Sequence, residues 1–155
     1  MRRIAVDTNL LLLLVVGSAS RSHIARHKRL RAYSIEDFDF LLEILRNTDE
    51  IVATPNAWTE VSNLAGFGLV DPIRSEVFAA LANLINKLHE RYRTSSSASE
   101  EPEFARLGLT DCAWLESSGS NTILLTDDLQ LYLAACHRGM NAFNFTHLRE
   151  QRGLL

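Results

Sequence analysis

The stretch Ile4-Ala5-Val6-Asp7-Thr8-Asn9, followed by the apolar run of residues 10–16, decides how this chain folds. Its first three residues are apolar and two of them are β-branched, which predicts a short buried strand. The run 10–16 then predicts a buried helix that ends near Gly17. Asp7 lies between these two elements, where open α/β sheets bind ligands. Asp7 is therefore the first candidate functional residue.

The composition is typical of a soluble globular protein. The chain has 155 residues, so we expect a single domain over residues 1–155 that can bury a core. The hydrophobic fraction of 46% and the charged fraction of 23% are ordinary values. A net charge of −3 excludes a polycationic nucleic-acid-binding chain, but it leaves a local basic face open.

Neither a membrane segment nor a secretory signal is predicted. The run 10–16 is far shorter than the ~20 residues that a transmembrane helix needs, so we assign it to the core. Asp7-Thr8-Asn9 interrupts the hydrophobic stretch that a signal peptide would require. Cys112 and Cys136 lie on separate segments without metal or redox spacing, and we expect both to be buried thiols. The expected location is the cytoplasm, with no membrane partner.

Short strands and helices alternate along the rest of the chain. Strands are predicted at residues 51–53 and 123–125, and residues 142–145 could form a last one. An amphipathic helix is predicted after Ser34, which forms a weak capping box with Asp37. Thr54-Pro55 opens another helix, and Asp71-Pro72 repeats this signal for a longer one. The alternation predicts an α/β protein with a mostly parallel sheet.

Apolar stripes complete this prediction. The expected buried faces are Phe38, Leu41, Leu42 and Leu45; Ala57, Trp58, Val61, Leu64 and Ala65; Ile73, Val77, Leu81, Leu84 and Leu88; and Leu129, Tyr132, Leu133 and Cys136. Residues 94–101 are a low-complexity stretch that we expect to be a mobile surface loop. Thr110 is the expected cap of a short helix that starts near Leu109.

Acidic residues recur at comparable places in this pattern. Asp7 and the pair Asp127 and Asp128 follow predicted strands, while Glu60 and Asp111 lie early in predicted helices. Crowded carboxylates raise each other's pKa unless a cation neutralises them. Mg²⁺ or Mn²⁺ would do so, because both prefer oxygen ligands. Such a site suits phosphodiester hydrolysis, in which a metal ion activates water and stabilises the leaving oxygen.

These motifs, in this order, resemble those of the PIN-domain ribonucleases. The matching stretches are residues 4–9, Glu60 on a helix opened by Thr54-Pro55, residues 109–113, and residues 124–128. The family includes toxins of bacterial toxin–antitoxin pairs. The resemblance implies a three-layer α/β/α fold with a central, mostly parallel sheet. It also implies a metal-dependent endoribonuclease with an RNA substrate, an antitoxin protein as partner and a homodimeric state.

Carried over residue by residue, the resemblance implies roles for the acidic and polar positions. The metal-binding and catalytic cluster would be Asp7, Glu60, Asp111 and Asp128, with Asp127 as the neighbouring candidate for the fourth place. Asn9 and Thr126 would support the cluster. The interval between Asp7 and Glu60 is longer than in compact toxin members of the family, and most of the extra length lies in the basic segment of residues 18–35.

Each position also has a simpler interpretation. Asp7 could cap the following helix, Glu60 could be a solvated helix residue, and Asp111 could interact with a helix dipole. One of Asp127 and Asp128 could be only an N-cap. The basic segment could be a mobile loop or could contact RNA phosphates through Arg21, Arg26, Lys28, Arg29 and Arg31. A catalytically weak PIN-like module that binds RNA or protein, or another metal-dependent phosphoesterase, remains an alternative to the ribonuclease.

Overall fold

Strand β1 (Arg3–Val6) lies at the centre of a parallel sheet in the computed structural model, which describes residues 1–117 and 121–155. The strand order is β3-β2-β1-β4-β5, and every pairing among them is parallel. Ala5 pairs with Val52 on one side and with Leu124 on the other. The other strands are β2 (Glu50–Ala53), β3 (His89–Glu90), β4 (Thr122–Thr126) and β5 (Ala142–Asn144). The expected α/β fold with a parallel sheet is confirmed.

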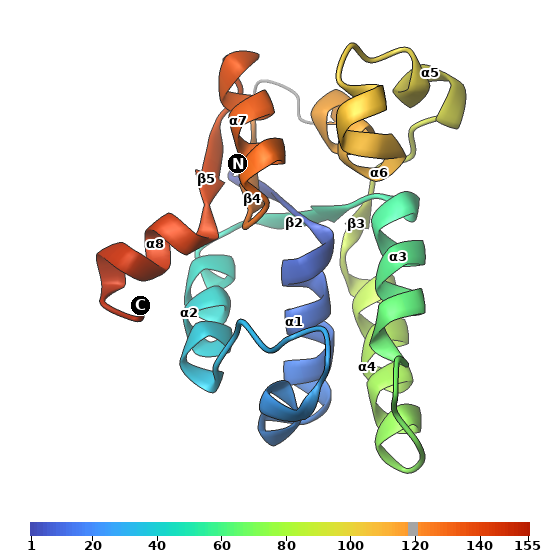
Figure 1. Ribbon diagram of the computed structural model, residues 1–155, viewed down its shortest axis with the longest axis vertical. Helices are drawn as coiled ribbons and strands as arrows, with labels where there is room; N and C mark the ends of the chain where they lie inside the picture. Colours follow the sequence, from blue (N-terminus) through green and yellow to red (C-terminus); the bar gives the residue numbers. More distant parts are fainter. Residues whose placement is uncertain (118–120) are drawn as a thin grey trace.

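Helices cover both faces of this sheet. On one side lie α1 (Thr8–Ala19), α2 (Ile35–Arg46), α3 (Pro55–Ala65) and α4 (Ile73–Lys87), while α5 (Ser95–Ser99), α6 (Phe104–Ser117) and α7 (Leu129–His137) lie on the other (Figure 1). The right-handed rule for parallel crossovers explains this division, because connections running toward β3 and connections running toward β5 must cross on opposite faces. The result is the three-layer α/β/α arrangement.

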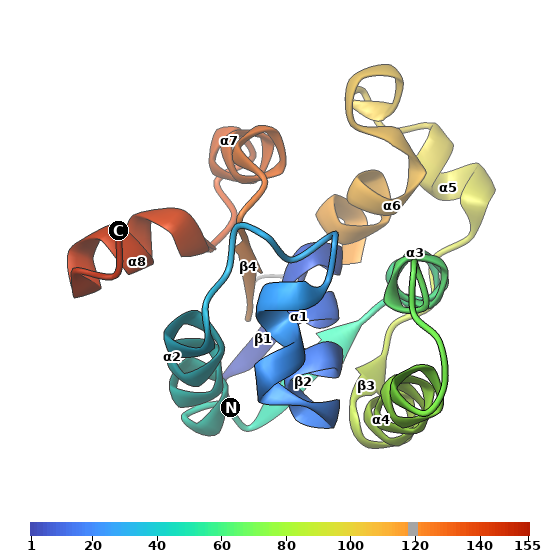
Figure 2. The ribbon, with the colours of Figure 1, turned by 60° about the horizontal axis from the view of Figure 1, so that its bottom comes forward.

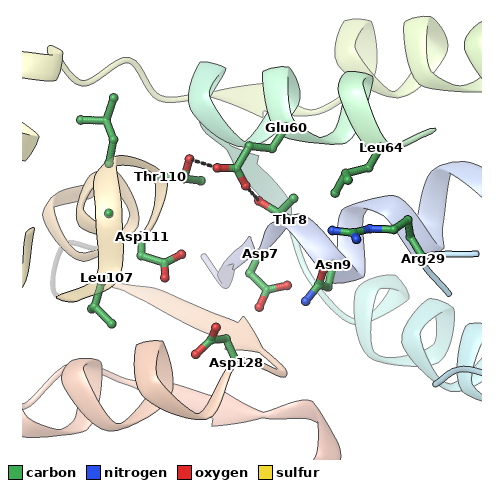
Figure 3. A pocket seen from close by; sticks show the side chains of 12 residues that line it. Asp7, Thr8, Asn9, Arg29, Glu60, Leu64, Leu107, Thr110, Asp111 and Asp128 are labelled. Atoms are coloured by element: carbon green, nitrogen blue, oxygen red, sulfur yellow. Dashed lines mark hydrogen bonds between the residues drawn. The ribbon is translucent and has the colours of Figure 1, made fainter. Parts of the chain in front are cut away.

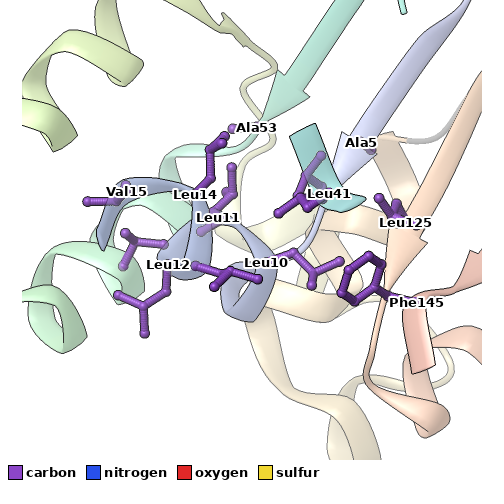
Figure 4. Packing of buried hydrophobic residues seen from close by; sticks show 14 of the residues in the cluster. Ala5, Leu10, Leu11, Leu12, Leu14, Val15, Leu41, Ala53, Leu125 and Phe145 are labelled. Atoms are coloured by element: carbon purple, nitrogen blue, oxygen red, sulfur yellow. The ribbon is translucent and has the colours of Figure 1, made fainter. Parts of the chain in front are cut away.

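Helix α1 is the centre of the helical layer. All its residues from Leu10 to Gly17 are buried, as expected for a helix that is apolar on every side. It packs against α2, α3, α4 and the 3₁₀ helix η1 (Arg21–Arg26), as Figure 2 shows from below. Leu10 and Phe145 both belong to the buried core (Figure 4). The predicted run 10–16 therefore anchors Asp7 to the most buried part of the molecule.

Local capping signals form as predicted at two helices. Ser34 and Asp37 make a full capping box on α2, and Thr54 accepts a hydrogen bond from the backbone N–H of Ala57 at 3.2 Å. Helix α4 begins one residue later than its signal suggested. Pro72 precedes it, and Asp71 accepts hydrogen bonds from the backbone and hydroxyl of Ser75.

Three predictions about the second half of the chain are wrong. The stretch 94–101 contains helix α5, capped by Thr94. On α7 the buried residues are Leu131, Ala134 and Ala135, while Leu129 and Leu133 are about half exposed. Cys136 is exposed because it lies on this outer side, whereas Cys112 is buried as expected.

The end of the chain also differs from the prediction. Phe145 begins a further helix, α8 (Phe145–Arg152), instead of continuing the last strand. Arg149 on α8 forms a buried ion pair with Asp37 of α2, with Nε and Oδ1 2.7 Å apart. None of the described helices combines the length and the apolar character needed to cross a bilayer.

Candidate active site

The candidate site lies where the strand order reverses. From β1 the chain first adds β2 and β3 on one side, and it then returns to add β4 and β5 on the other. The helices that follow β1 and β4 consequently diverge and leave a crevice beyond the carboxyl ends of these two strands. Ligand sites of open α/β sheets lie in such crevices. Asp7 follows β1 here, and Asp127 and Asp128 follow β4.

Asp7 is held in place by three hydrogen bonds. It caps α1 by accepting from the backbone N–H of Leu10 at 3.2 Å, as the simpler interpretation suggested. It also accepts from the hydroxyl of Thr126 and from the backbone N–H of Asp127. Its side chain is buried, and burial together with the charge of Asp127 raises the pKa of Asp7 to about 7, although the three hydrogen bonds act in the opposite direction.

Asp127 and Asp128 occupy different surroundings. Asp128 caps α7, accepting from the backbone N–H groups of Gln130 and Leu131, and it lines the pocket described below. Asp127 accepts a hydrogen bond from the side chain of Asn9 at 3.3 Å, and burial raises its pKa. Thus Asp128 faces the pocket, and Asp127 lies beside Asp7 and α1.

Glu60 lies on α3 at the opposite wall. Its carboxylate accepts hydrogen bonds from the hydroxyls of Thr110, at 2.5 Å, and Thr8, at 3.3 Å. Thr110 was expected to cap a helix, but it lies within α6 and holds Glu60 instead. Glu60 is therefore tied to both neighbouring elements.

Asp111 reaches the site because α6 bends. Gly108 interrupts the helix with φ 82° and ψ −179°, a conformation that favours glycine. The chain restarts its helical turn at this point and carries Asp111 into the crevice. Burial, followed by the charges of Asp128 and Glu60, raises the pKa of Asp111 to about 7.

Asp7, Glu60, Asp111 and Asp128 line one pocket of about 280 Å³. In Figure 3 the side chains of Asp7, Asp111 and Asp128 point toward a common space, and Glu60 turns toward its two threonine partners. In the described part of the chain, no three His, Cys, Asp or Glu residues lie close enough together to ligate one metal ion directly. The arrangement provides clustered negative charge at the site, but the described residues do not form a closed cage of protein ligands.

The basic segment contributes one residue to this pocket, Arg29. Arg21 instead pairs with Asp39, with its Nη1 2.6 Å from a carboxylate oxygen, and Lys28 lies over the ring of Phe67. Arg26 and Arg31 are exposed and do not line the pocket. The segment is folded, because its apolar side chains Ile24, Leu30 and Tyr33 are buried in the core. Its packing argues against a freely solvated loop.

Sequence reasoning missed several residues of this pocket. Thr8 and Thr110 hold Glu60, and Gly108 bends α6 toward the site. Gly108 stands directly before the stretch 109–113, so a glycine at a helix start was a usable signal. The hydroxyl contacts to Glu60 join residues about fifty positions apart and had no local signal.

Comparison with known proteins adds little to this geometry. No protein-family model matches the sequence, and no curated protein matches it. The chain is similar in structure to a domain of a functionally unknown protein from Methanocaldococcus jannaschii DSM 2661. The two are 21% identical, the similarity covers 93% of this chain and 91% of the other, and the TM-score is 0.49.

Proposed function

We propose that this protein is a Mg²⁺- or Mn²⁺-dependent endoribonuclease of the PIN type, which hydrolyses RNA phosphodiester bonds in the carboxylate pocket. The observation that carries the proposal is the convergence of Asp7, Asp111 and Asp128 from three separate elements. Burial and neighbouring carboxylates raise the pKa of both Asp7 and Asp111 to about 7; the neighbour is Asp127 for Asp7, and Asp128 and Glu60 for Asp111. A divalent cation would relieve this repulsion, so the donor set fits a hard metal ion.

The wide spacing of the described carboxylates is compatible with a metal that keeps much of its water. Mg²⁺ is usually bound through one or two carboxylates and several waters, so a group of three direct protein ligands is not required. Asp7 and Asp111 are the residues that would hold it, with Asp128 and Glu60 as outer partners. When bound, the ion would act as a Lewis acid and lower the pKa of a coordinated water.

The chain's own residues would orient the substrate and the carboxylates. Three hydrogen bonds fix Asp7, and a carboxylate offers about four acceptor positions, so one remains for a ligand. The threonine contacts hold Glu60 at the wall of the pocket. Arg29 stands at the pocket with a guanidinium suited to an RNA phosphate.

The test is cleavage of RNA by purified protein with Mn²⁺ or Mg²⁺. Asp7→Asn and Asp111→Asn should each abolish cleavage while the protein remains folded. Asp49→Asn is the matched control. Asp49 directly precedes β2 and therefore lies at the amino ends of the strands, opposite the carboxyl ends where the pocket lies. If the wild-type protein degrades no RNA, or Asp111→Asn cleaves normally, the proposal is wrong. Activity on a nucleotide or sugar phosphate alone would favour a different phosphoesterase.

The wide spacing of the described carboxylates favours one second candidate, a catalytically weak PIN-like module that binds RNA or protein. The two candidates differ in their response to metal, because an ion that binds only the folded protein raises its melting temperature. Stabilisation by Mn²⁺ that disappears in Asp7→Asn favours the nuclease. No stabilisation favours the module.

The toxin role, the antitoxin partner, homodimerisation and the cytoplasmic location belong to the same proposal. The toxin role and the antitoxin partner are tested by expressing the protein in bacterial cells with and without a candidate antitoxin, homodimerisation by the molar mass of the purified protein in solution, and location by cell fractionation. Wild-type protein should arrest growth, and the Asp7→Asn variant should not. Growth that is equal for both proteins would remove the toxin role while leaving the biochemical proposal to its own test.

A further inference from the structure

A second hollow adjoins the carboxylate pocket along helix α3. Its volume is about 410 Å³, and it is lined by Pro55 and Asn56 from the start of α3 and by Tyr92 and Arg93 from the segment after β3. The two hollows share Glu60, Leu109 and Thr110 as a common wall. A ligand that extends beyond the carboxylates in this direction enters the second hollow.

The topology explains why these residues meet at the same edge as Asp7. Strand β3 runs parallel to β2, and the backbone N–H of Arg91 extends the ladder by donating to the carbonyl of Ala53 at 2.9 Å. Tyr92 and Arg93 therefore leave the sheet at its carboxyl edge, beside the start of α3. Asp7 leaves the same edge one strand beyond β2.

The side chains of this hollow suit a nucleotide. Tyr92 is 70% exposed and lines the hollow, so its side chain is accessible to a stacking partner. Arg93 is half-buried, and its Nε is shielded from solvent without a hydrogen-bond partner in the described part of the chain. Because Nε is shielded, a phosphate in the hollow would be bound through the terminal nitrogens of the guanidinium, whose planar geometry suits it. An aromatic ring beside an arginine is a common way to bind single-stranded nucleic acid.

Helix α3 joins this hollow to the basic segment. A third hollow of about 290 Å³ is lined by Arg29, Glu60, Asn63 and Leu64, so Glu60 borders all three. From Asn56 to Leu64 the helix spans about 12 Å. One stacked nucleotide rises ~3.4 Å, so this length of α3 can accommodate more than one nucleotide. One arginine stands at each end of this path, and the carboxylates lie between them.

We infer that the second hollow is a nucleotide subsite, which holds the nucleotide next to the cleaved bond when an RNA strand lies along α3. The base of this nucleotide stacks on Tyr92, and Arg93 binds the adjoining phosphate. A base in a duplex is already paired and stacked, so a single strand is the form that this hollow accepts. The inference deepens the proposed function and rests on it for the position of the cleaved bond.

The first test measures binding without cleavage. A fluorescently labelled single-stranded RNA oligonucleotide is titrated with protein in EDTA, and its anisotropy gives Kd. Tyr92→Ala should raise Kd about 5- to 100-fold, as for the loss of one stacked base, while Tyr92→Phe should keep the wild-type value. Phe143→Ala is the control, because Phe143 is an exposed aromatic residue on the opposite edge strand, β5.

The second arm concerns the arginine. Arg93→Gln should weaken binding and reduce the slope of log Kd against log salt by about one. Arg46→Gln is the control, since Arg46 is exposed at the end of α2, away from the hollow. The inference is overturned if Tyr92→Ala binds as tightly as wild type, if Tyr92→Phe is as weak as Tyr92→Ala, or if a fully paired duplex binds as well as the single strand.

Cleavage kinetics separate this inference from the nuclease proposal. With Mn²⁺, Tyr92→Ala should raise KM and leave kcat close to wild type, because the ring lies outside the carboxylate pocket. If wild type cleaves RNA and Tyr92→Ala has an unchanged KM, the inference fails and the nuclease stands. If RNA binds in a Tyr92-dependent way but is never cleaved, the nuclease fails and the nucleotide site stands.

Discussion

Replacing Asp7 by asparagine should stabilise the metal-free protein at alkaline pH. Asp7 is buried, and its pKa is raised from 3.8 to about 7 by burial and by Asp127. Between pH 4 and pH 7 the folded state therefore binds more protons than the unfolded state, so stability decreases as the pH rises through this window. An asparagine side chain at this position carries no charge and does not contribute this loss.

The magnitude follows from the size of the pKa change. An increase in the pKa from 3.8 to about 7 lowers the free energy of unfolding at pH 8 by roughly 4 kcal/mol, because each pKa unit corresponds to ~1.4 kcal/mol. Asparagine is as good an N-cap as aspartate, so the contact with Leu10 is retained. With the amide oxygen at Oδ1, the NH2 group replaces Oδ2, which accepts from both Thr126 and the backbone N–H of Asp127. The hydroxyl of Thr126 can accept in return, but the backbone N–H of Asp127 loses its acceptor, which costs about 1–2 kcal/mol. The net gain is about 2–3 kcal/mol.

Guanidinium denaturation in EDTA at pH 5 and pH 8 measures this effect. Asp7→Asn should be more stable than wild type at pH 8, and the difference should shrink by about 2–3 kcal/mol at pH 5, where Asp7 is protonated in the folded state. Asp49→Asn, at the amino ends of the strands, should show no such pH dependence. If Asp7→Asn is less stable than wild type at pH 8 without metal, the carboxylate is not repelled in the folded protein and the reasoning is refuted.

Three further predictions address the metal and the core. Mn²⁺ at about 100 times its Kd should stabilise wild type by about 2.7 kcal/mol at pH 8. The stabilisation should be smaller at pH 5, because protons compete with the metal for the carboxylates. Equal melting temperatures with and without Mn²⁺ would contradict this prediction. Gly17→Ala should cost about 1–3 kcal/mol, because the added Cβ meets the ring of Phe38, while the exposed Ser18→Ala should be nearly neutral. Arg149→Met should cost about 3–5 kcal/mol in chemical denaturation, because it leaves the buried carboxylate of Asp37 without its partner; a cost below about 1 kcal/mol would show that the pair does not matter.

The elements that could be predicted from the sequence are those specified by local signals. The three central strands are short apolar runs, and the caps at Ser34 and Thr54 bond to their own helices. The buried helix after Asp7 followed from its uninterrupted apolar residues. Each of these features depends on residues a few positions apart, so the pattern carries the information.

Some of the missed features also involve partners that a local pattern does not show. Helix α8 has local caps at Asn144 and Gly153, but Arg149 also fixes it by pairing with Asp37, 112 positions earlier. On α7 apolar residues occur on both sides, and small Ala134 and Ala135 allow close packing on the sheet, while larger Leu133 remains outside. A stripe chosen by residue size selects the wrong face when close packing favours alanine.

In the candidate site too, the residues with local signals could be predicted and the contacts between distant residues could not. Asp7 and the pair Asp127 and Asp128 could be placed from the sequence because they lie between a strand and a helix, but which of the pair faces the pocket stayed open. The opposite wall could not, because Glu60 depends on Thr8 and Thr110, and Asp111 depends on the bend at Gly108. The order of the acidic residues was visible, but the contacts that orient them are tertiary.

Thr126 explains why two consecutive aspartates do not compete for one place. Its hydroxyl donates to Asp7 and accepts from the backbone N–H of Asp128 at 2.9 Å, so it joins the ends of β1 and β4 through one oxygen. Asp128 caps α7 and lines the pocket, whereas Asp127 lies toward α1, where Asn9 donates to it. Asp127 then acts on the site through its charge, which raises the pKa of Asp7, while Asp128 presents its carboxylate to the pocket.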